Sequence, residues 1–293
     1  MIGFQEMKNR GTQDFPFSRY HFEKRISGSM ITQTHWHPDM EILYLRRGAL
    51  EVRLRQNLSI LSAGDILLIH PNMLHNVRVV DDDTCYDALV FSWDLLALPE
   101  HHFLQRQLLQ PLLSGAYCFP DLLSSDLPVY SQALPLIRRI CDADPSGGNY
   151  KLSVFSDLLA VFSLLSEHCP LIAREDSTPH PDQDSIKNCL SYLSRNFRNH
   201  LTLQEIAQQV HLHPNYLCAR FKCVTGQTVF QHLTQLRLEE AARLLRTTRK
   251  SISQIAAECG FESTGFFTRK FKAFMGITPK TYSLNYGFSS ESS

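Results

Sequence analysis

Three histidines and a glutamate stand at spacings that could bring their side chains together. His35 and His37 are separated by one residue, Glu41 follows four residues later, and His75 comes after further strand-forming residues. Residues two apart in a β-strand point to the same face, so two imidazoles, a carboxylate and a third imidazole from a neighbouring strand can converge. Such a cluster could hold a divalent metal, line a pocket for a small molecule, or satisfy its own hydrogen bonds.

A second stretch with functional chemistry runs over residues 255–282, where two short helical patterns meet at Gly260. Phe267, Phe271 and Phe274 recur at helical spacing, which predicts that they face one core. The basic residues of the same helix fall largely on its other faces: Arg269, Lys270 and Lys272. A short helix, a glycine turn and a basic second helix are typical of a helix-turn-helix that reads DNA, although a solvated helical hairpin would look similar.

The elements that must position the histidines are short strands over residues 20–91. Residues 48–55 alternate between apolar and polar, residues 41–46 alternate in part, and residues 65–70 form a continuous apolar run. Gly48, Gly64 and Pro71 separate these runs as turn residues. Many short strands with regular turns predict a β-barrel or sandwich.

The spacing from His35 to Gly48, with Gly64, Pro71 and His75 after it, resembles the cupin family. The resemblance implies a jelly-roll barrel in which the metal-ligand positions are His35, His37, Glu41 and His75. The second motif is looser than the first, since Met73 stands near a usual glycine and the spacing from proline to histidine is shorter.

Helical patterns follow the strands at residues 93–113, 131–141 and 152–168. The last is apolar around most of its circumference, which indicates either burial against the barrel or pairing with a second copy of the chain. Residues 170–183 hold three prolines and mostly polar groups, so we expect a linker between a first domain at residues 1–169 and a second at 184–293.

The second domain contains an internal repeat, which argues against the basic stretch being merely a solvated helical hairpin. Ile206 and Ala207 recur 49 residues later, and Phe221 and Lys222 recur 50 residues later, so one residue has been gained inside the second turn. The helix starts repeat as well, with three capping-box sequences and an N-cap followed by proline. They begin at Thr202, Thr228, Ser251 and Thr278.

This repeated unit resembles the DNA-binding domain of AraC/XylS transcription regulators, over residues 184–286. The string from Gly260-Phe261 through Phe271-Lys272 and Gly276 to Thr278-Pro279 is highly specific to that family. The resemblance implies seven helices, two helix-turn-helix units joined by a rigid helix at about residues 229–245, and a cupin-like effector and dimerisation domain before them.

The resemblance places the recognition helices at residues 214–223 and 264–274. With Leu217, Phe221, Phe267 and Phe271 turned inward, nine residues remain for contacts with DNA. They are Asn215, Cys218, Ala219, Lys222, Thr264, Gly265, Thr268, Arg269 and Lys272. The sequence departs from the family pattern at His213, Ala219 and Gly265, so we expect less base recognition from the first helix.

Charge and cysteine content agree with an intracellular DNA-binding protein. Residues 183–293 hold 14 Lys and Arg against 7 Asp and Glu, although the whole chain of 293 residues is neutral. A basic domain favours binding to a polyanion. The eight cysteines form no Cys-x-x-Cys pair and the start of the chain has no apolar signal segment, so we expect reduced thiols, a cytoplasmic location and no membrane span.

The sequence therefore predicts a two-domain protein, an all-β cupin with appended helices followed by an all-α tandem helix-turn-helix. We expect a sequence-specific transcription regulator and not an enzyme, partnered by double-stranded DNA, a small-molecule effector near the four cupin residues, a second copy of itself and, if it activates, RNA polymerase. No cofactor is expected. The alternatives are a metal-dependent cupin enzyme or sensor with an appended DNA module, and a scaffold that binds nucleic acid without specificity.

Overall fold

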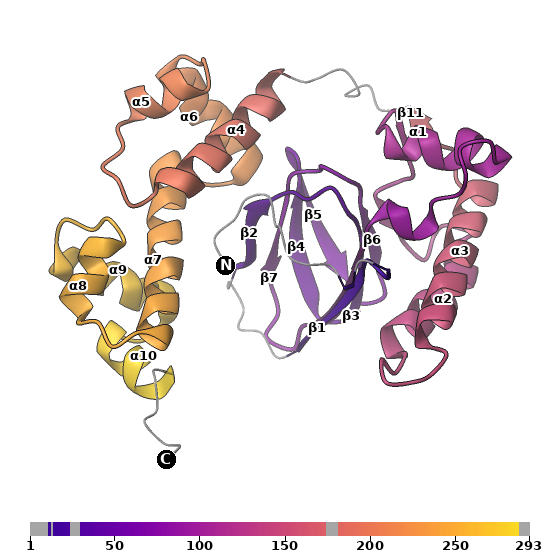
Figure 1. The fold of residues 1–293 in the computed structure, drawn as a ribbon, viewed down its shortest axis with the longest axis horizontal. Helices are drawn as coiled ribbons and strands as arrows, with labels where there is room; N and C mark the ends of the chain where they lie inside the picture. Colours follow the sequence, from indigo (N-terminus) through magenta and orange to yellow (C-terminus); the bar gives the residue numbers. More distant parts are fainter. Residues whose placement is uncertain (1–10, 13, 24–29, 174–180, 287–293) are drawn as a thin grey trace. The chain divides into compact units, whose positions relative to one another are not determined.

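The computed structural model describes residues 11–12, 14–23, 30–173 and 181–286. The chain divides into two compact units, and the second begins at Pro181. Figure 1 shows strands and a group of helices in the first unit and helices alone in the second. No helix in the described ranges is long and apolar enough to cross a membrane.

The first unit contains two antiparallel sheets that face each other. Five strands in the order β1-β8-β3-β6-β10 form one sheet, and four strands in the order β2-β7-β4-β5 form the other. Their bounds are β1 Phe17–Glu23, β2 Met30–His35, β3 Met40–Arg47, β4 Ala49–Leu54, β5 Asn57–Ser62, β6 Ile66–Ile69, β7 His75–Val79, β8 Cys85–Phe91 and β10 Leu122–Leu123. A small sheet pairs β9 Tyr117–Cys118 with β11 Ile172–Ala173.

Strand β3 is buried on both faces because it separates two cores. Leu43 and Leu45 pack into the interior between the sheets, beside Leu50 and Val52 of β4. Met40, Ile42 and Tyr44 point the other way, into a core shared with helices. Side chains alternate between the faces of a strand, so Glu41 lies on the interior face with Leu43 and Leu45.

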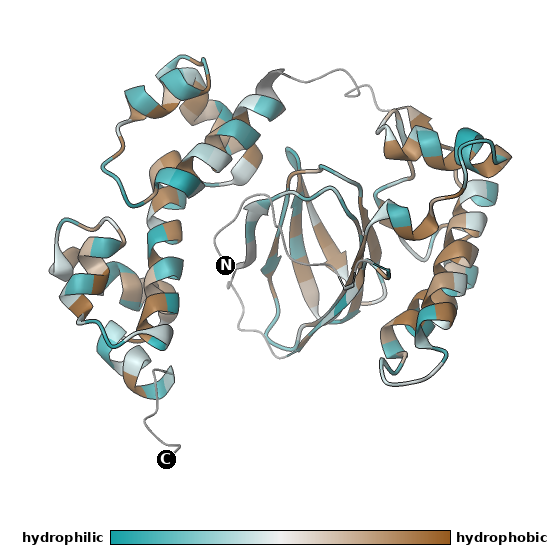
Figure 2. Ribbon diagram, in the orientation of Figure 1, coloured by the Kyte–Doolittle hydropathy of each residue, from teal (hydrophilic) through white to brown (hydrophobic). Residues whose placement is uncertain are grey.

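The helices of the first unit cover the outer face of the five-stranded sheet. The predicted helix at residues 93–113 is broken into a 3-10 turn η1 Trp93–Leu96, a π turn η2 Gln105–Leu109 and a single α-turn α1 Gln110–Leu113. Two longer helices follow, α2 Tyr130–Asp142 and α3 Tyr150–His168. Residues from Val154 to Leu165 on one face of α3 join the sheet core, while Leu152 and Leu159 remain 68% and 40% exposed. Figure 2 shows that hydrophobic residues run along much of this helix.

The second unit contains seven helices within its described residues, the number that the resemblance implies. They are α4 Pro181–Asn196, α5 Leu203–Gln209, α6 Pro214–Thr225, α7 Val229–Thr247, α8 Ile252–Glu258, α9 Thr264–Met275 and α10 Pro279–Tyr286. Each predicted capping box forms, so the hydroxyls of Thr202, Thr228 and Ser251 accept hydrogen bonds from the backbone three residues later. These caps satisfy N–H groups that would otherwise lack partners at helix starts.

The duplicated turns adopt the same backbone path with different residues. His211 and Gly260 both have positive φ, at 56° and 83°, and each follows the end of a short helix. The next residue donates its N–H to an equivalent carbonyl, from Leu212 to Ala207 and from Phe261 to Ala256. The N-caps that follow are His213 and Ser263, so Glu262 is the residue gained in the second turn.

One core prediction in the second repeat is wrong. Phe267 and Phe271 are fully buried, but Phe274 is 40% exposed. It lies in the last turn of α9, where the chain already turns away at Gly276 (φ 78°) towards α10. Met275 packs partly against the same core instead.

A buried histidine makes the stability of the second unit depend on pH. His232 of α7 is 0% exposed, the side-chain amide of Gln227 donates to its Nδ1 at 2.6 Å, and burial lowers its pKa to about 3. The folded chain therefore keeps this histidine neutral at pH values where the unfolded chain, with an ordinary pKa of about 6.5, takes up a proton. Stability is lost as the pH falls below that value.

We predict that the free energy of unfolding of this unit falls by about 1.4 kcal/mol per pH unit from His232 alone between about pH 6 and pH 4. Urea unfolding of the full chain, followed by hydrogen exchange at the amides of α7, measures it. His232→Gln should lower stability at pH 7 but flatten the dependence. Equal slopes in the two proteins would contradict the assignment.

Candidate functional site

The first recognition helix, α6, presents four of the predicted residues to solvent. Asn215, Cys218, Ala219 and Lys222 are exposed, while Leu217 and Phe221 are fully buried. His213 replaces the usual hydroxyl at the N-cap, and its Nδ1 still accepts from the backbone of Asn215 at 3.4 Å. The helix start is therefore capped, but the four predicted residues include only one amide and one cation.

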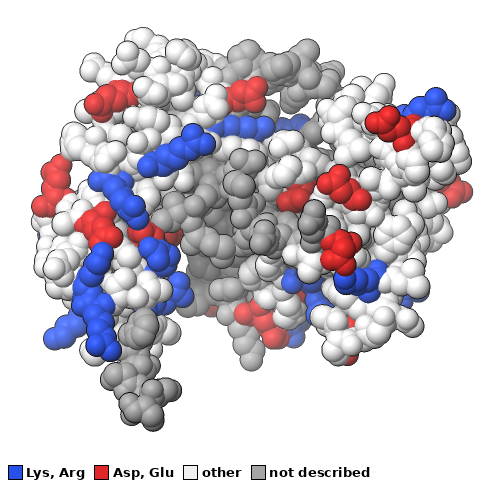
Figure 3. All heavy atoms as spheres, viewed as in Figure 1, with Lys and Arg blue, Asp and Glu red and all other residues white. Residues whose placement is uncertain are grey.

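The second recognition helix, α9, carries stronger DNA-contacting chemistry. Thr264, Gly265, Arg269 and Lys272 are exposed, and Thr268 is half-buried. The Thr268 hydroxyl donates to the carbonyl of Thr264 at 2.8 Å, so only its oxygen lone pairs and methyl group can meet DNA. Lys and Arg side chains lie close together on the surface of the helical unit in Figure 3.

Two exposed aromatic residues on these helices were not among the predicted contacts. Tyr216 and Phe266 are 47% and 42% exposed, and they lie 50 residues apart at the third position of α6 and of α9. The ammonium of Lys270 lies 5.5 Å from the Phe266 ring centre. The repeat offset of 50 residues links the two positions and could have identified the pair.

The structure brings the four cupin-like residues together at one end of the barrel. His35 ends β2 and pairs directly with His75, the first residue of β7. His37 lies in the loop before β3, and Glu41 comes from β3 itself. One ring nitrogen from each histidine lies within 4.8 Å of those of the other two, and all four residues are buried.

Each of these histidines uses its Nδ1 on a backbone carbonyl two residues away. His35 bonds Gln33 at 2.8 Å, His37 bonds Asp39 at 3.0 Å, and His75 bonds Met73 at 2.9 Å. A carbonyl only accepts, so each Nδ1 carries a proton and the lone pair of a neutral ring is on Nε2. This pattern fixes the ring orientation and tautomer in metal-binding histidines.

The Nε2 atoms converge on the carboxylate of Glu41. Glu41 Oε2 lies 3.0 Å from Nε2 of His37 and 3.6 Å from Nε2 of His75. Within the described residues the Nε2 of His75 has no hydrogen-bond partner. Burial and the nearby His35 lower the pKa of His75 to about 4, which keeps this ring neutral at pH 7.

Glu41 stays ionised in this enclosed site. Burial alone would raise the pKa of its carboxyl, but the hydrogen bond with His37 and the nearby His75 bring it below the ordinary value. A cation that displaced the proton between Nε2 of His37 and Glu41 would find three imidazole nitrogens and one carboxylate, the donor set that suits Fe²⁺, Mn²⁺, Ni²⁺ or Zn²⁺. The residues present therefore fit a divalent cation, and they equally offer polar partners to a small organic ligand.

Comparison with known proteins agrees with both halves of the chain. A family model described as an AraC-like ligand binding domain matches residues 18–144, and one described as a helix-turn-helix domain matches residues 206–285. The melibiose operon regulatory protein of Escherichia coli K12 is 26% identical over 277 residues, or 91% of this chain and 88% of that protein. The transcriptional activator RhaR of Yersinia pseudotuberculosis is 25% identical over 258 residues, or 85% and 83%.

Among solved structures, ToxT from Vibrio cholerae is similar with a TM-score of 0.43 and 16% identity, covering 92% of this chain and 98% of that one. The two matched domains follow the order that the sequence predicts, a β-rich unit and then the tandem helix-turn-helix. The chain belongs to the AraC family of DNA-binding transcription regulators and carries that family's ligand-binding domain ahead of its helix-turn-helix domain.

Proposed function

We propose that this regulator binds two successive major-groove segments of DNA with α6 and α9. A small molecule bound in its first domain controls this DNA binding. On this proposal residues 1–169 form the effector and dimerisation domain, residues 170–183 the linker and residues 184–293 the DNA-binding domain. On this proposal the residues that contact DNA are Asn215, Cys218, Ala219, Lys222, Thr264, Gly265, Thr268, Arg269 and Lys272.

Arg269 is the principal base reader in this proposal. Its side chain is exposed on α9, whose buried face is anchored by Phe267 and Phe271, so the helix presents the guanidinium from a rigid support. Arginine bonds both O6 and N7 of guanine in the major groove. Lys272 is placed on the phosphate backbone, where it adds affinity without sequence preference.

Replacing Arg269 with Ala should cost about 1–3 kcal/mol of binding at a single base position, because the contact with one guanine is lost. The measurement is binding to a duplex selected by this protein from a random pool, with every base pair changed in turn. Lys272→Ala is the matched control and should weaken binding to all duplexes alike. If Arg269→Ala also weakens binding uniformly, Arg269 does not read a base.

Phe266 is proposed to contact the 5-methyl group of a thymine beside the guanine that Arg269 reads. It is exposed in the first turn of α9, the part of a recognition helix that meets base edges. Replacing that thymine with uracil removes one methyl group, which should weaken binding about fourfold. In the Phe266→Ala protein the same replacement should have no effect, and an equal loss in both proteins would exclude the contact.

The effector site is proposed at His35, His37, Glu41 and His75. These polar side chains converge from β2, β3, β7 and the loop before β3 on an interior lined by apolar residues. A divalent cation there is a second candidate, favoured by the three Nδ1 hydrogen bonds that direct the Nε2 atoms inward. A bound cation would polarise an oxygen-bearing effector as a Lewis acid.

If the cation is part of the site, purified protein should bind about one Zn²⁺ or Mn²⁺ per chain. His75→Ala should weaken that binding by at least about tenfold, since it removes a direct ligand. His101→Ala, at an exposed histidine of the same unit, is the control. Calorimetric titration and metal analysis measure both. Equal affinity in the two variants would leave an organic effector as the occupant.

Two further partners are proposed, a second copy of the chain and RNA polymerase. Leu152 and Leu159 of α3 are exposed apolar residues on a helix, so this face is proposed to contact a second copy of the chain in a two-fold dimer. The name of RhaR states that this relative activates transcription. If the present chain also activates transcription, RNA polymerase is a further partner.

A further inference from the structure

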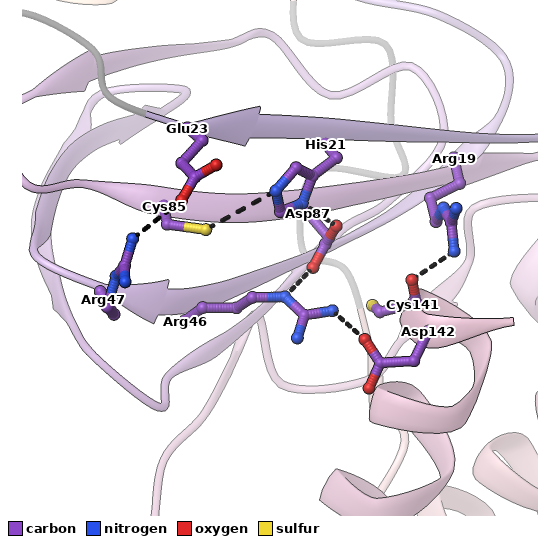
Figure 4. Close-up of a pocket in the computed structure, with 9 residues that line it drawn as sticks. All are labelled: Arg19, His21, Glu23, Arg46, Arg47, Cys85, Asp87, Cys141 and Asp142. Carbon is purple, nitrogen blue, oxygen red and sulfur yellow. Dashed lines mark hydrogen bonds and ion pairs between the residues drawn. The ribbon is translucent and has the colours of Figure 1, made fainter.

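An open cavity of about 430 Å³ lies on the outer face of the five-stranded sheet, where β1, β3 and β8 meet the end of α2 (Figure 4). Its size falls within the range of about 300–1,000 Å³ typical of small-molecule sites. Phe17, Leu89 and Phe91 face the helix core, and Arg19, His21 and Asp87 lie on that same face of β1 and β8. The histidine cluster lies on the interior side of the same sheet, so the cavity and the cluster are two different sites.

A β-bulge turns two consecutive arginines into this cavity. Leu45 pairs with Tyr86 and Arg47 pairs with Cys85, which leaves Arg46 as the extra residue of β3. Without the bulge, Arg46 and Arg47 would point to opposite faces of the sheet. Bulges often redirect side chains at functional sites. Figure 4 shows both arginines among the residues that line the cavity.

One side of the cavity is fixed. Asp87 is fully buried, and its carboxylate accepts hydrogen bonds from Nε of Arg46 and from Nδ1 of His21, the latter at 2.8 Å. Burial would lower the pKa of Arg46, but the carboxylates of Asp87 and Asp142 raise it above its ordinary value. The guanidinium is therefore held by Asp87 at its Nε, while its Nη2 faces Asp142 across the cavity.

The other side is made of carboxylates that a ligand can replace. Nη2 of Arg46 bonds Asp142 at 2.7 Å and Nη2 of Arg47 bonds Glu23 at 3.1 Å, and the side chains of Asp142 and Glu23 are 62% and 48% exposed. An exposed ion pair contributes only about 0–1 kcal/mol. A carboxylate carried by a small molecule would gain the same hydrogen bonds and additional contacts in the cavity.

We propose that this cavity is a binding site for a small organic acid, whose carboxylate takes the place of Asp142 on Arg46 and contacts Arg47. His21, half exposed at the opening, supplies a further polar contact. The site goes beyond the effector role proposed for the histidine cluster, and it lies wholly within the ligand-binding match of residues 18–144.

The proposed exchange also changes how the barrel holds α2. Arg19 donates to the carbonyls of Cys141 and Ala143 at the end of that helix, and Asp142 is the helix's ion pair with β3. An acid that displaces Asp142 removes this ion pair at the end of α2 and leaves the Arg19 hydrogen bonds and the Arg138–Tyr44 hydrogen bond in place. Ligand binding would thus change the contacts of α2 at its end next to α3. Helix α3 carries the proposed dimer contact.

The test is calorimetric titration of the full chain with acetate, succinate, citrate and benzoate, each beside its uncharged amide, and with inorganic phosphate. At least one acid should saturate the protein with about one site, and its amide should not bind. Asp142→Asn removes the competing carboxylate, so it should tighten acid binding about two- to fivefold. Arg47→Gln should weaken it by a similar factor or more.

Two matched controls separate these effects from net charge. Asp14→Asn removes an exposed carboxylate paired with Lys151 in the same unit, and Arg78→Gln removes an exposed cation near Glu51. Neither control should change acid affinity. Both controls should also bind DNA as the parent does in the absence of acid, so a failure of the DNA proposal shows up separately.

The proposal is overturned if none of the four acids binds at millimolar concentration, or if phosphate binds more tightly than all of them. It is also overturned if Asp142→Asn leaves the affinity unchanged or lowers it, as an ion pair with a purely structural role would. Loss of acid binding in His75→Ala with no effect of Arg47→Gln would place the acid in the histidine cluster and overturn the site.

Discussion

The second unit depends on a close backbone approach between its two halves. A Cβ at Gly260 would lie 2.6 Å from the carbonyl oxygen of Arg198, so only glycine fits in the turn between α8 and α9. Arg237 of α7 donates to the carbonyls of Phe197 and Asn199 in the same loop. The turn of the second helix-turn-helix is thus packed against the segment that follows α4, and the two recognition helices are held by one framework.

A buried carboxylate on α7 reinforces this framework. Glu240 is 1% exposed and bonds Arg198 at 2.7 Å and Arg243 at 2.7 and 2.9 Å. An unpaired buried charge is costly, so Glu240 is stabilised by both arginines, and its bond with Arg198 ties the loop after α4 to α7. Because α7 packs against α4 and α6 as well as α8, α9 and α10, the separation of α6 and α9 is set by a rigid helix rather than by a linker. A tandem reader needs such a fixed separation, since successive major grooves are a fixed distance apart.

Much of this could be predicted from the sequence, because the relevant patterns are local. The repeat offset, the capping boxes and the spacing of Phe267 and Phe271 identified both helix-turn-helix units, and the cupin resemblance placed Glu41 with the histidines. Period-two spacing does not hold for His35 and His37, because β2 ends at His35 and His37 lies in the loop before β3. What the sequence did not reveal depends on tertiary contacts. Tyr216 and Phe266 look like core residues until burial is known, and Phe274 leaves the core only because α9 ends one residue later, at Met275. The bulge at Arg46 and its partner Asp142, 96 residues away, have no local signature.

Strand β3 connects the two candidate ligand sites of the first unit. Glu41 faces the interior with the histidines, whereas Arg46, five residues along, lies in the outer cavity. Between them the strand is buried on both faces, and such close-packed segments shift as a unit rather than deform locally. The attachment of α2 is different in kind, since its ion pair Arg46–Asp142 has a partly exposed cation and a largely exposed carboxylate. A ligand with about 1 kcal/mol of preference can shift such a contact, but not the strand. The helix end at Asp142 is therefore the part of this domain best suited to respond to a bound molecule.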